Sequence, residues 1–453
     1  MASSINFRSV RPVLDSAAPH VFIETYGCQM NVNDSEVVLS ILQGAGFTLC
    51  SQPEDATLVL INTCAIRDNA EQRILGRLDF YRLLKKKNPR LIVGVLGCMA
   101  ERLKDSLLEH PAVDLVAGPD AYRDLPRLIG ILGSSGSKQI NTLLSHEETY
   151  ADISPVRMDP GGVSAFISIM RGCNNVCSYC VVPYTRGAER SRDPESILRE
   201  VGEVFDAGYR EVTLLGQNVD SYRYGDTGFA QLLARVAQVS PQLRVRFSTS
   251  HPKDMKDEVL LTMASYPNIC RHIHLPVQSG SNAILEKMGR RHTREWYLER
   301  VARIREVMPD CAITTDVIAG FCSETEDDFE DTLDLMRTVR FDAAFMFQYS
   351  ERPGTKAARH FPDDVPPQAK TERLEKIIAL QSEMSLESNR RDLGRCFEVL
   401  IEGHSKKSDA DLMGRTSQNK ACVFPAAGHA IGEYVTVRVL SCTAATLLCE
   451  IVD

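Results

Sequence analysis

At 453 residues the chain is too long for one ordinary domain, and we expect roughly two to four. A hydrophobic content of 43% with 25% charged residues is typical of a globular protein, and no apolar run approaches the about 18 residues that a membrane helix needs. The net charge of −8 excludes a surface that attracts nucleic acid over its whole area, but it allows local basic patches.

The N-terminus contains no apolar secretory segment. It reads MASSINFRSVRPVLDSAAPH, and its acidic Asp15 and short length argue against an organelle transit peptide. We therefore predict a flexible tail over residues 1–19 and a cytoplasmic protein.

Fourteen cysteines are many for a reducing compartment, where disulfides are rare, so clustered cysteines indicate metal or redox chemistry. Six of them form two sets of three, which are described below. The others stand singly, and we interpret them as small buried hydrophobic residues. These are Cys50, Cys270, Cys311, Cys322, Cys396, Cys422, Cys442 and Cys449.

Residues 20–150 alternate apolar strands with helical stretches, beginning with HVFIETYGC and NDSEVVLSILQGAGF, which predicts a parallel sheet with flanking helices. Cys28, Cys64 and Cys98 each terminate a predicted strand. Neighbouring parallel strands end at one edge, where open α/β sheets bind ligands, so we expect the three thiols to meet there. Three thiolates would leave one iron of a 4Fe–4S cluster open. Three buried core cysteines are the alternative.

A basic stretch lies within this domain. Residues 67–90 hold eight Lys or Arg against three acids. The stretch is either a solvated helix face or a patch that faces phosphates, and the sequence leaves both possibilities open.

Residues 151–387 form the predicted central domain, in which a strand followed by a helix recurs six times from residue 163 onward. Six units are too few for a closed eightfold barrel, so we predict a partial, open-sided (β/α)6 barrel. The active groups of such a barrel lie on the loops at the C-terminal ends of its strands.

The second set of cysteines lies in RGCNNVCSYC, directly after the first strand of the predicted barrel. Cys173, Cys177 and Cys180 fall within eight positions, a spacing that can wrap one metal centre. A zinc knuckle would need a fourth ligand, and the next His or Cys along the chain is His251. A 4Fe–4S cluster held by three cysteines keeps one iron free for a small molecule.

The pattern C-x3-C-x2-C, with Tyr179 before its last cysteine, resembles that of the radical S-adenosylmethionine (SAM) enzymes. The resemblance implies that SAM binds the open iron through its amino and carboxylate groups. It also implies reductive cleavage of SAM to a 5′-deoxyadenosyl radical, which abstracts hydrogen from an unactivated C–H bond.

Residues 388–453 change character and run as short β segments broken by Gly, Ser and Asp, which predicts a small all-β barrel. This module holds eight basic and eight acidic residues, so it is neutral while the rest of the chain carries the negative charge. The relative basicity is consistent with an RNA-facing module.

The two cysteine sets and the three segments together resemble the methylthiotransferases over about residues 20–453. That family combines an N-terminal domain with an auxiliary three-cysteine cluster, a radical SAM barrel and a C-terminal TRAM barrel. Several stretches look most like the tRNA branch of the family: TYGCQMN, CSYCVVPYTRGAERSR, LLGQNVDSY, STSHP, HLPVQSGS and GRTSQNK. The stretch GQNVDSY favours that branch over the others.

The resemblance implies conversion of N6-isopentenyladenosine beside the tRNA anticodon to its 2-methylthio form. It implies two 4Fe–4S clusters and two SAM molecules for each turnover. One SAM methylates a sulfur on the auxiliary cluster of Cys28, Cys64 and Cys98. The other is cleaved at the second cluster, and its radical takes hydrogen from carbon 2 of the adenine. An electron donor such as flavodoxin or ferredoxin and a monomeric protein are also expected.

Polar residues at the predicted strand ends are candidates for binding SAM, although each could instead satisfy the backbone at a strand terminus. Tyr179 is a candidate through its place in the cysteine motif, and the stretch from Asp316 to Gly320 resembles a segment that contacts adenine. The strand-end candidates are Gly216, Gln217, Asn218, Ser248, Ser250, Gln278 and Asp316.

Basic residues near the second cysteine set are candidates for the RNA or for sulfur. Arg186, Arg190 and Arg192 are expected to contact substrate phosphates or a cluster-bound sulfur, with a surface charge run as the alternative. Arg415 and Lys420 in GRTSQNK are the matching candidates for the RNA backbone in the β module.

Two other functions fit the sequence less well. The same reaction could act on threonylcarbamoyladenosine in tRNA or on an aspartate of a ribosomal protein. A zinc-stabilised RNA-binding protein without catalysis is the alternative from a different class.

Overall fold

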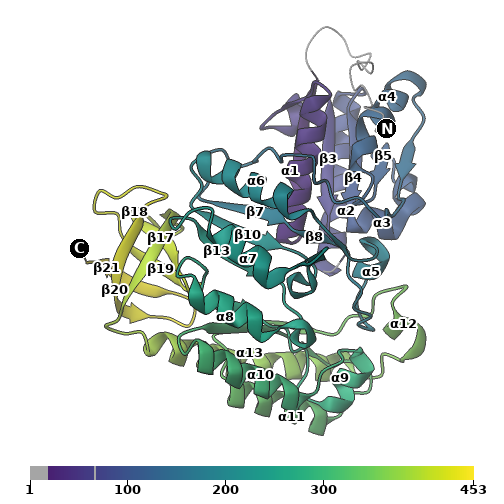
Figure 1. Cartoon of the computed structure of the whole chain (residues 1–453). Helices are drawn as coiled ribbons and strands as arrows, with labels where there is room; N and C mark the ends of the chain where they lie inside the picture. The colour runs from purple at the N-terminus through teal and green to yellow at the C-terminus, as the bar shows by residue number, and fades with distance from the viewer. Residues whose placement is uncertain (1–18, 66–67, 453) are drawn as a thin grey trace. The chain divides into compact units, whose positions relative to one another are not determined.

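The computed structural model describes residues 19–65 and 68–452 and divides into two compact units (Figure 1). The N-terminal unit holds the chain up to Met158 together with Met170–Asn174 and Val181–Arg192. The C-terminal unit holds Asp159–Ile169, Asn175–Cys180 and the chain from Asp193 onward. The predicted tail, residues 1–19, lies outside the described residues except for its last position.

The N-terminal unit is built on a six-stranded parallel sheet of order β2-β1-β3-β4-β5-β6. The central strand β3 is buried along its whole length, as its apolar sequence LVLINT requires. The predicted parallel sheet is confirmed. Its strands are β1 (His20–Thr25), β2 (Thr48–Leu49), β3 (Leu58–Thr63), β4 (Ile92–Gly97), β5 (Leu115–Ala117) and β6 (Gln139–Asn141).

Helices cover both faces of this sheet (Figure 1). Helices α1 (Gln29–Gly44) and α4 (Leu125–Ser135) contribute to the apolar core on one face. Helices α2 (Asp68–Lys87) and α3 (Cys98–Leu103) contribute to the core on the other. Short 3₁₀ turns lie at Pro53–Asp55, Lys104–Glu109 and Tyr122–Asp124.

A short antiparallel pair also belongs to the N-terminal unit, although it lies within the range predicted for the central domain. Strand β8 (Met170–Arg171) pairs with β9 (Arg190–Ser191), and α5 (Val182–Thr185) lies between them in sequence. Gly172 allows the tight approach, because a Cβ there would lie 2.0 Å from the carbonyl oxygen of Ala188.

The C-terminal unit contains two three-stranded parallel sheets, of orders β13-β10-β7 and β14-β15-β16. Backbone hydrogen bonds of Val245 with Asn268 and Cys270 join them, as does the one from Ser250 N to His274 O. Six parallel strands in this order confirm the predicted partial barrel. The strands are β7 (Ser164–Ser168), β10 (Glu211–Leu215), β13 (Arg244–Ser248), β14 (His272–His274), β15 (Ala312–Ala319) and β16 (Ala343–Gln348).

Helices follow these strands, and several begin with the caps that the sequence provides. Asp193 caps α6, and Thr325 forms a capping box with Asp328 at the start of α11. The helices are α6 (Pro194–Asp206), α7 (Phe229–Ala237), α8 (Asp257–Ser265), α9 (Asn282–Met288), α10 (Arg294–Val307), α11 (Glu326–Val339), α12 (Lys356–His360) and α13 (Pro367–Arg390). A small hairpin of β11 (Arg223–Tyr224) and β12 (Thr227–Gly228) precedes α7, and 3₁₀ turns lie at Val219–Ser221 and Pro252–Asp254.

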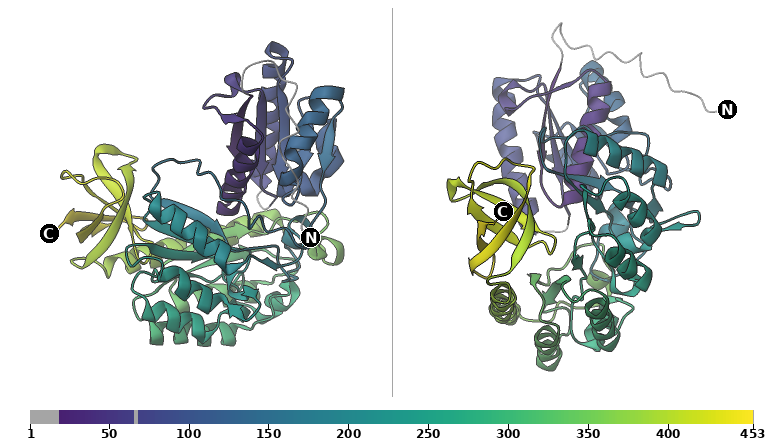
Figure 2. Two further views of the ribbon diagram at one scale, coloured as in Figure 1. Left: turned by 45° about the horizontal axis from the view of Figure 1, so that its top comes forward. Right: turned by 60° about the vertical axis from the view of Figure 1, so that its left-hand side comes forward.

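The C-terminal strands close into a barrel of order β17-β18-β19-β21-β20, which confirms the predicted all-β module (Figure 2, yellow). Alternate side chains such as Val399, Ile401 and Val437 fill its core. Tyr434 Oη donates to the carbonyl oxygens of Arg210 and Gln242 and so ties the module to the partial barrel. The strands are β17 (Cys396–Ser405), β18 (Ser408–Thr416), β19 (Ala421–Pro425), β20 (Tyr434–Cys442) and β21 (Leu447–Ile451).

Over residues 19–65 and 68–452, none of the helices combines the length and the apolar character that crossing a bilayer requires.

Candidate active site

The N-terminal unit brings its three strand-end cysteines to one edge of the sheet. Cys64 and Cys98 directly follow β3 and β4, whose last residues, Thr63 and Gly97, lie opposite each other in the register. Cys28 lies three residues beyond β1, which pairs with β3 on its other side, and it precedes α1.

Close packing at this edge places the thiols near one another. Gly27 has φ +135°, and a Cβ there would lie 2.7 Å from the Cβ of Cys64. Burial and, to a lesser extent, the charge of Cys28 raise the pKa of Cys98, although Arg186 opposes them. Cys64 and Cys98 are buried and Cys28 is exposed, so this thiol set is reachable from one side.

A buried arginine contacts this thiol set. Arg186 Nε lies 3.1 Å from Cys98 Sγ, and Arg186 Nη2 donates to Asp34 Oδ2 at 2.7 Å. Arg171 Nη1 donates to the other oxygen of Asp34 at 2.8 Å. Burial opposes ionisation of Asp34, but the two guanidinium groups outweigh it and hold the pKa below its usual range. Arg186 Nη1 is buried without a hydrogen-bond partner among the described residues.

These contacts correct the prediction for the arginines near the second cysteine set. Arg190 binds the Asp120 carboxylate at 2.9 and 3.0 Å and also donates to backbone carbonyls of Ser145 and Glu148. Its guanidinium is therefore saturated within the unit. Arg192 is buried as well, with 5% of its surface exposed, so the alternative of a surface charge run is wrong, and a phosphate contact of either arginine stays a prediction. Arg186, also buried, fits the other predicted alternative, a contact at a cluster sulfur.

Two cysteines of the second set lie in the C-terminal unit, and Cys173 lies in the N-terminal unit. Arg290 Nη1 lies 3.6 Å from Cys177 Sγ, and its Nη2 donates to the carbonyl oxygen of Pro276 at 2.6 Å. Tyr179 is packed edge-on against Phe321, with ring centroids 6.4 Å apart. Arg290 belongs to none of the motifs predicted from the sequence, and its buried guanidinium lies beside Cys177, a candidate cluster ligand.

Buried polar atoms without partners gather at the ends of β10 and β13, which adjoin in the sheet. Gly216 N donates to Ser248 O at 3.3 Å, and Val219 N donates to Thr249 O at 3.0 Å, so the two loops run together. Within residues 19–65 and 68–452, the side-chain oxygens Gln217 Oε1, Asn218 Oδ1 and Ser250 Oγ are buried with no hydrogen-bond partner. Unsatisfied polar atoms are costly, so this cradle fits a polar cofactor such as SAM.

Gln278 and Asp316 lie in the adjoining sheet. Gln278 has φ +75° and bridges to β15, where its N–H donates to Asp316 O at 2.9 Å. Asp316 Oδ1 lies 3.4 Å from His274 Nε2. The structure therefore places Gln278 beside Asp316 of β15, and it places the other candidates at the ends of β10 and β13, namely Gly216, Gln217, Asn218, Ser248 and Ser250.

Two buried histidines beside Arg290, His251 and His292, were not predicted as site residues from the sequence. Their ring centroids are 6.0 Å apart. Burial and the nearby Arg290 lower the pKa of His251 to about 2 and that of His292 to about 4, so both are neutral near pH 7. His292 Nε2 is buried and, in the described part of the chain, has no partner.

The arrangement of the His, Cys, Asp and Glu side chains distinguishes a site for one metal ion from a site for a cluster. Over residues 19–65 and 68–452, no group of three or more His, Cys, Asp or Glu is arranged to hold one metal ion. In a 4Fe–4S cubane each cysteine binds a different iron atom, so its sulfurs stand further apart than the ligands of one ion. The donor set at each site, thiols with a neighbouring arginine, fits such a cluster.

The β module contains the two basic residues that were predicted to contact the RNA backbone, Lys420 and Arg415. Lys420 Nζ lies 2.6 Å from Asp392 Oδ2 and 2.9 Å from Ser388 Oγ, with 14% of its side chain exposed. This lysine is therefore engaged within the unit, and its RNA-backbone contact stays a prediction. Arg415 lies 3.3 Å from Glu402 with 38% of its side chain exposed, and its RNA contact stays a prediction.

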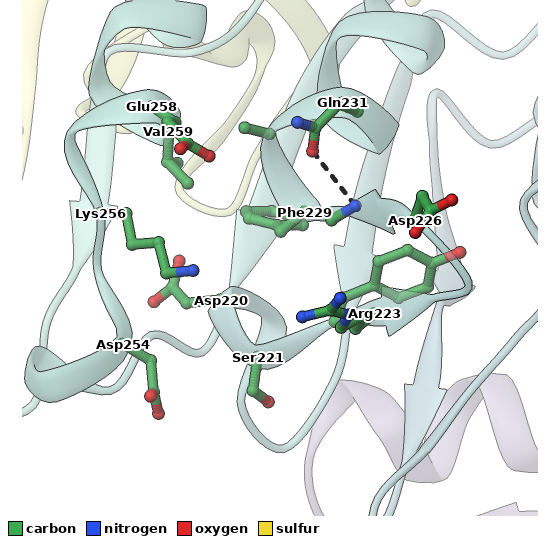
Figure 3. A pocket seen from close by; sticks show the side chains of 13 residues that line it. Asp220, Ser221, Arg223, Asp226, Phe229, Gln231, Asp254, Lys256, Glu258 and Val259 are labelled. Atoms are coloured by element: carbon green, nitrogen blue, oxygen red, sulfur yellow. Dashed lines mark hydrogen bonds between the residues drawn. The ribbon is translucent and has the colours of Figure 1, made fainter.

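A pocket of about 390 Å³ lies beside the loop that follows β10 (Figure 3). Asp220, Asp254 and Lys256 line it, together with residues of the β11–β12 hairpin and the first turns of α7 and α8. The Asp220 carboxylate faces Ser250 and the backbone of His251, yet neither of its oxygens makes a hydrogen bond of good geometry to a described residue. Burial raises its pKa to about 7.

Asp220→Asn is expected to remove a pH dependence of stability. Because the unfolded carboxyl ionises near pH 3.8 and the folded one near 7, wild-type stability falls as pH rises through this window and levels off above it. The variant should be more stable than wild type at pH 8, on the order of 4 kcal/mol, and equal to it near pH 4. Urea unfolding at pH 4.5, 6 and 8 measures this, and parallel pH profiles for the two proteins would contradict it.

Comparison with known proteins agrees with the geometry. The Radical SAM superfamily matches residues 167–336, the Uncharacterized protein family UPF0004 matches residues 20–118, and the TRAM domain matches residues 390–452. Among solved structures, the radical S-adenosylmethionine methyltransferase TsrM from Kitasatospora setae, with cobalamin and a [4Fe-4S] cluster bound, has a similar fold. Its TM-score is 0.58 at 15% identity, over 76% of this chain and 77% of that one.

Curated relatives are much more similar. The tRNA-2-methylthio-N(6)-dimethylallyladenosine synthase of Phocaeicola vulgatus is 58% identical over 438 residues, covering 96% of each chain. The protein of that name from Parabacteroides distasonis is 52% identical over 457 residues, covering 100% of each. Fold, cysteine sets and family models thus define a radical SAM transferase with a TRAM domain. The chain belongs to the tRNA-2-methylthio-N(6)-dimethylallyladenosine synthase family, which implies SAM and 4Fe–4S chemistry.

Proposed function

We propose that the protein converts N6-isopentenyladenosine next to the anticodon of tRNA to 2-methylthio-N6-isopentenyladenosine. The observation that carries this proposal is a second thiol set, Cys28, Cys64 and Cys98, at one sheet edge of a chain that also holds radical SAM cysteines. A hydrogen-abstracting enzyme needs only one cluster, whereas sulfur insertion also needs a sulfur source. Relatives that bear the name of this activity support it over nearly the whole chain.

In this proposal the six cysteines hold two clusters. Cys173, Cys177 and Cys180 would hold the 4Fe–4S cluster that, when bound, supplies the electron for SAM cleavage. Cys28, Cys64 and Cys98 would hold the auxiliary cluster, where Arg186, fixed by Asp34, donates to the sulfur of Cys98. A positive donor at a ligand sulfur stabilises added negative charge there, so Arg186 would raise the reduction potential of a cluster held by these cysteines.

The SAM molecule would be oriented by the unsatisfied polar groups of the partial barrel. Gln217, Asn218 and Ser250 offer buried oxygens to its amino and hydroxyl groups, and Arg290 offers an N–H that has no partner in the described part of the chain. Gly216, Ser248, Gln278, Asp316 and Tyr179 complete the proposed set. Of this set Gln278 is buried and the others are half-buried, so the groups that would bind SAM are partly shielded from water.

The partners follow from this activity. The substrate is a tRNA anticodon stem-loop, contacted in part by the TRAM barrel through Arg415, and the electron comes from a donor such as flavodoxin or ferredoxin. The protein acts as a monomer in the cytoplasm. In a stem-loop the target base is unpaired and can be turned toward a site, which suits recognition of a single adenosine.

The proposal is tested by mass spectrometry of tRNA from cells that lack this protein. We expect the 2-methylthio group to disappear from isopentenyladenosine and to return when the gene is restored. A Cys64→Ala copy, which keeps the fold but lacks one thiol, is the matched control and should not restore it. Unchanged 2-methylthio-isopentenyladenosine, with loss of the group from threonylcarbamoyladenosine or from a ribosomal protein, would reject the proposal.

A metal analysis separates the enzyme from a zinc-stabilised RNA-binding protein. Protein purified without oxygen should contain roughly eight irons with acid-labile sulfide. Stoichiometric zinc without iron would reject the enzyme assignment.

A further inference from the structure

One face of the β14–β15–β16 sheet carries two exposed aromatic rings. On the opposite face, Ile273, Ile313 and Val317 are buried. The rings belong to Phe345, which is 60% exposed, and Phe347, which is 41% exposed. A phenylalanine gains little by facing water, so two exposed rings on one strand indicate a surface that something apolar covers.

The two rings form a continuous surface with the neighbouring strand. In the parallel register Phe345 lies opposite Asp316, and Phe347 lies opposite Ile318. Side chains two residues apart on one strand point to the same face and stand about 7 Å apart. The two rings together therefore offer a longer surface than one ring would.

Hydrogen bonds fix the histidine that packs beside Phe345. The hydroxyl of Thr314 bridges His272 Nε2 and His274 Nδ1, each at 3.0 Å, and His274 meets Phe345 edge-on with ring centroids 5.7 Å apart. The surface is thus ordered before any ligand arrives, which lowers the entropic cost of binding.

This face lies near Cys177 and Cys180, the two radical SAM cysteines of the same unit. Ile318, the neighbour of Phe347, packs with Tyr179 against one apolar cluster that includes Phe321. Tyr179 lies between Cys177 and Cys180 along the chain, and the charge of Asp316, the neighbour of Phe345, acts on Tyr179. A ligand on the two rings would therefore lie close to the proposed site of radical formation.

We propose that Phe345 and Phe347 receive the N6-isopentenyl adenine of the substrate and read its alkenyl group; this inference rests on the proposed function. Purines stack on aromatic side chains, and a branched five-carbon group needs apolar surface beside the base. Two rings in line match a base that carries such a group. Part of the proposed SAM set, Gln217, Asn218 and Ser250, lies at the ends of β10 and β13, and Asp316 of the same set lies opposite Phe345, so the base would bind next to SAM.

The test compares two synthetic anticodon stem-loops, identical except for adenosine or N6-isopentenyladenosine at the target position. Their dissociation constants are measured by fluorescence anisotropy with anaerobic, cluster-loaded protein. Wild type should bind the isopentenylated RNA roughly 10- to 100-fold more tightly. Phe345→Ala and Phe347→Ala should each bring that ratio close to one, with little change for the unmodified RNA, and Phe345→Leu should keep part of it.

Leu261→Ala on α8 is the matched control, because Leu261 is 51% exposed and lies on a helix away from this face; it should keep the wild-type ratio. Both Phe variants retaining the wild-type ratio would overturn the inference. So would weaker binding of SAM in these variants with unchanged discrimination between the RNAs, because the rings would then serve the cofactor. Wild type that transfers no methylthio group to the isopentenylated RNA would overturn the proposed function itself, a result distinct from both.

Discussion

Cys173→Ala is expected to abolish both SAM cleavage and methylthio transfer, whereas Cys64→Ala should abolish transfer and leave cleavage intact. Each cysteine supplies one of three thiolates to a different proposed cluster, and two thiolates do not hold a 4Fe–4S cluster firmly. Release of 5′-deoxyadenosine measures cleavage, and mass spectrometry of the RNA measures transfer. Each variant should retain about four irons where wild type holds about eight.

Cys50→Ala is the matched control for this pair of variants. Cys50 lies in the N-terminal unit, outside both thiol sets, and its thiol donates to the backbone carbonyls of Val21 and Gln52. The control should keep the iron content and both activities. Normal methylthio transfer by Cys64→Ala, or a full iron content in that variant, would contradict the role of the strand-end thiols.

Asp34→Ala is expected to destabilise the N-terminal unit by about 3–5 kcal/mol. Asp34 is fully buried between Arg171 and Arg186, so its removal leaves two buried guanidinium groups without their counter-charge. Since its pKa lies below the unfolded value of 3.8, the stabilisation is complete above that pH and is lost as the pH falls further. Hydrogen–deuterium exchange of β3 and β4 peptides, measured across a urea series, reports this loss.

Asp152→Ala is the control for that experiment. Asp152 also pairs with an arginine, Arg123, but its side chain is 71% exposed, so its loss should cost at most about 1 kcal/mol. Equal effects of the two variants would contradict the argument from burial. Asp34→Ala should also lower the iron content, because Arg186 loses the partner that directs it to Cys98.

The sequence was sufficient for the architecture because periodic patterns report burial directly. Apolar runs such as LVLINT predict strands buried on both faces, and the place of Cys64 and Cys98 at strand ends follows from parallel topology. Alternation in the last segment predicts the small barrel in the same way. These are local signals, and the structure agrees with them.

Local sequence patterns did not predict which residues form ion pairs with the charged side chains. Arg186 and Arg190 occur in a charge run typical of a surface loop, but their partners Asp34 and Asp120 lie 152 and 70 positions away along the chain. No local pattern reports an ion pair at that separation. The ion pair of Lys420 was not predicted for the same reason, because its partner Asp392 lies 28 positions away along the chain.

The exposed face of the strand AAFMFQ was not predicted. Phe345 and Phe347 are exposed on β16, the last strand of the incomplete barrel. The six units predicted an open-sided barrel, but which side chains of its last strand stay exposed depends on what packs against that strand, which a local pattern does not report.

The grouping of Met170–Asn174 and Val181–Arg192 with the N-terminal unit has a consequence for how this protein can be dissected. A fragment that stopped at Met158 would lack Arg171, Arg186 and Arg190, and would bury Asp34 and Asp120 with no cation to neutralise them. Such a truncation is expected to be insoluble or unfolded. A gene fusion or deletion that separated these segments is expected to meet the same barrier, so a stable N-terminal fragment must include Met170–Asn174 and Val181–Arg192.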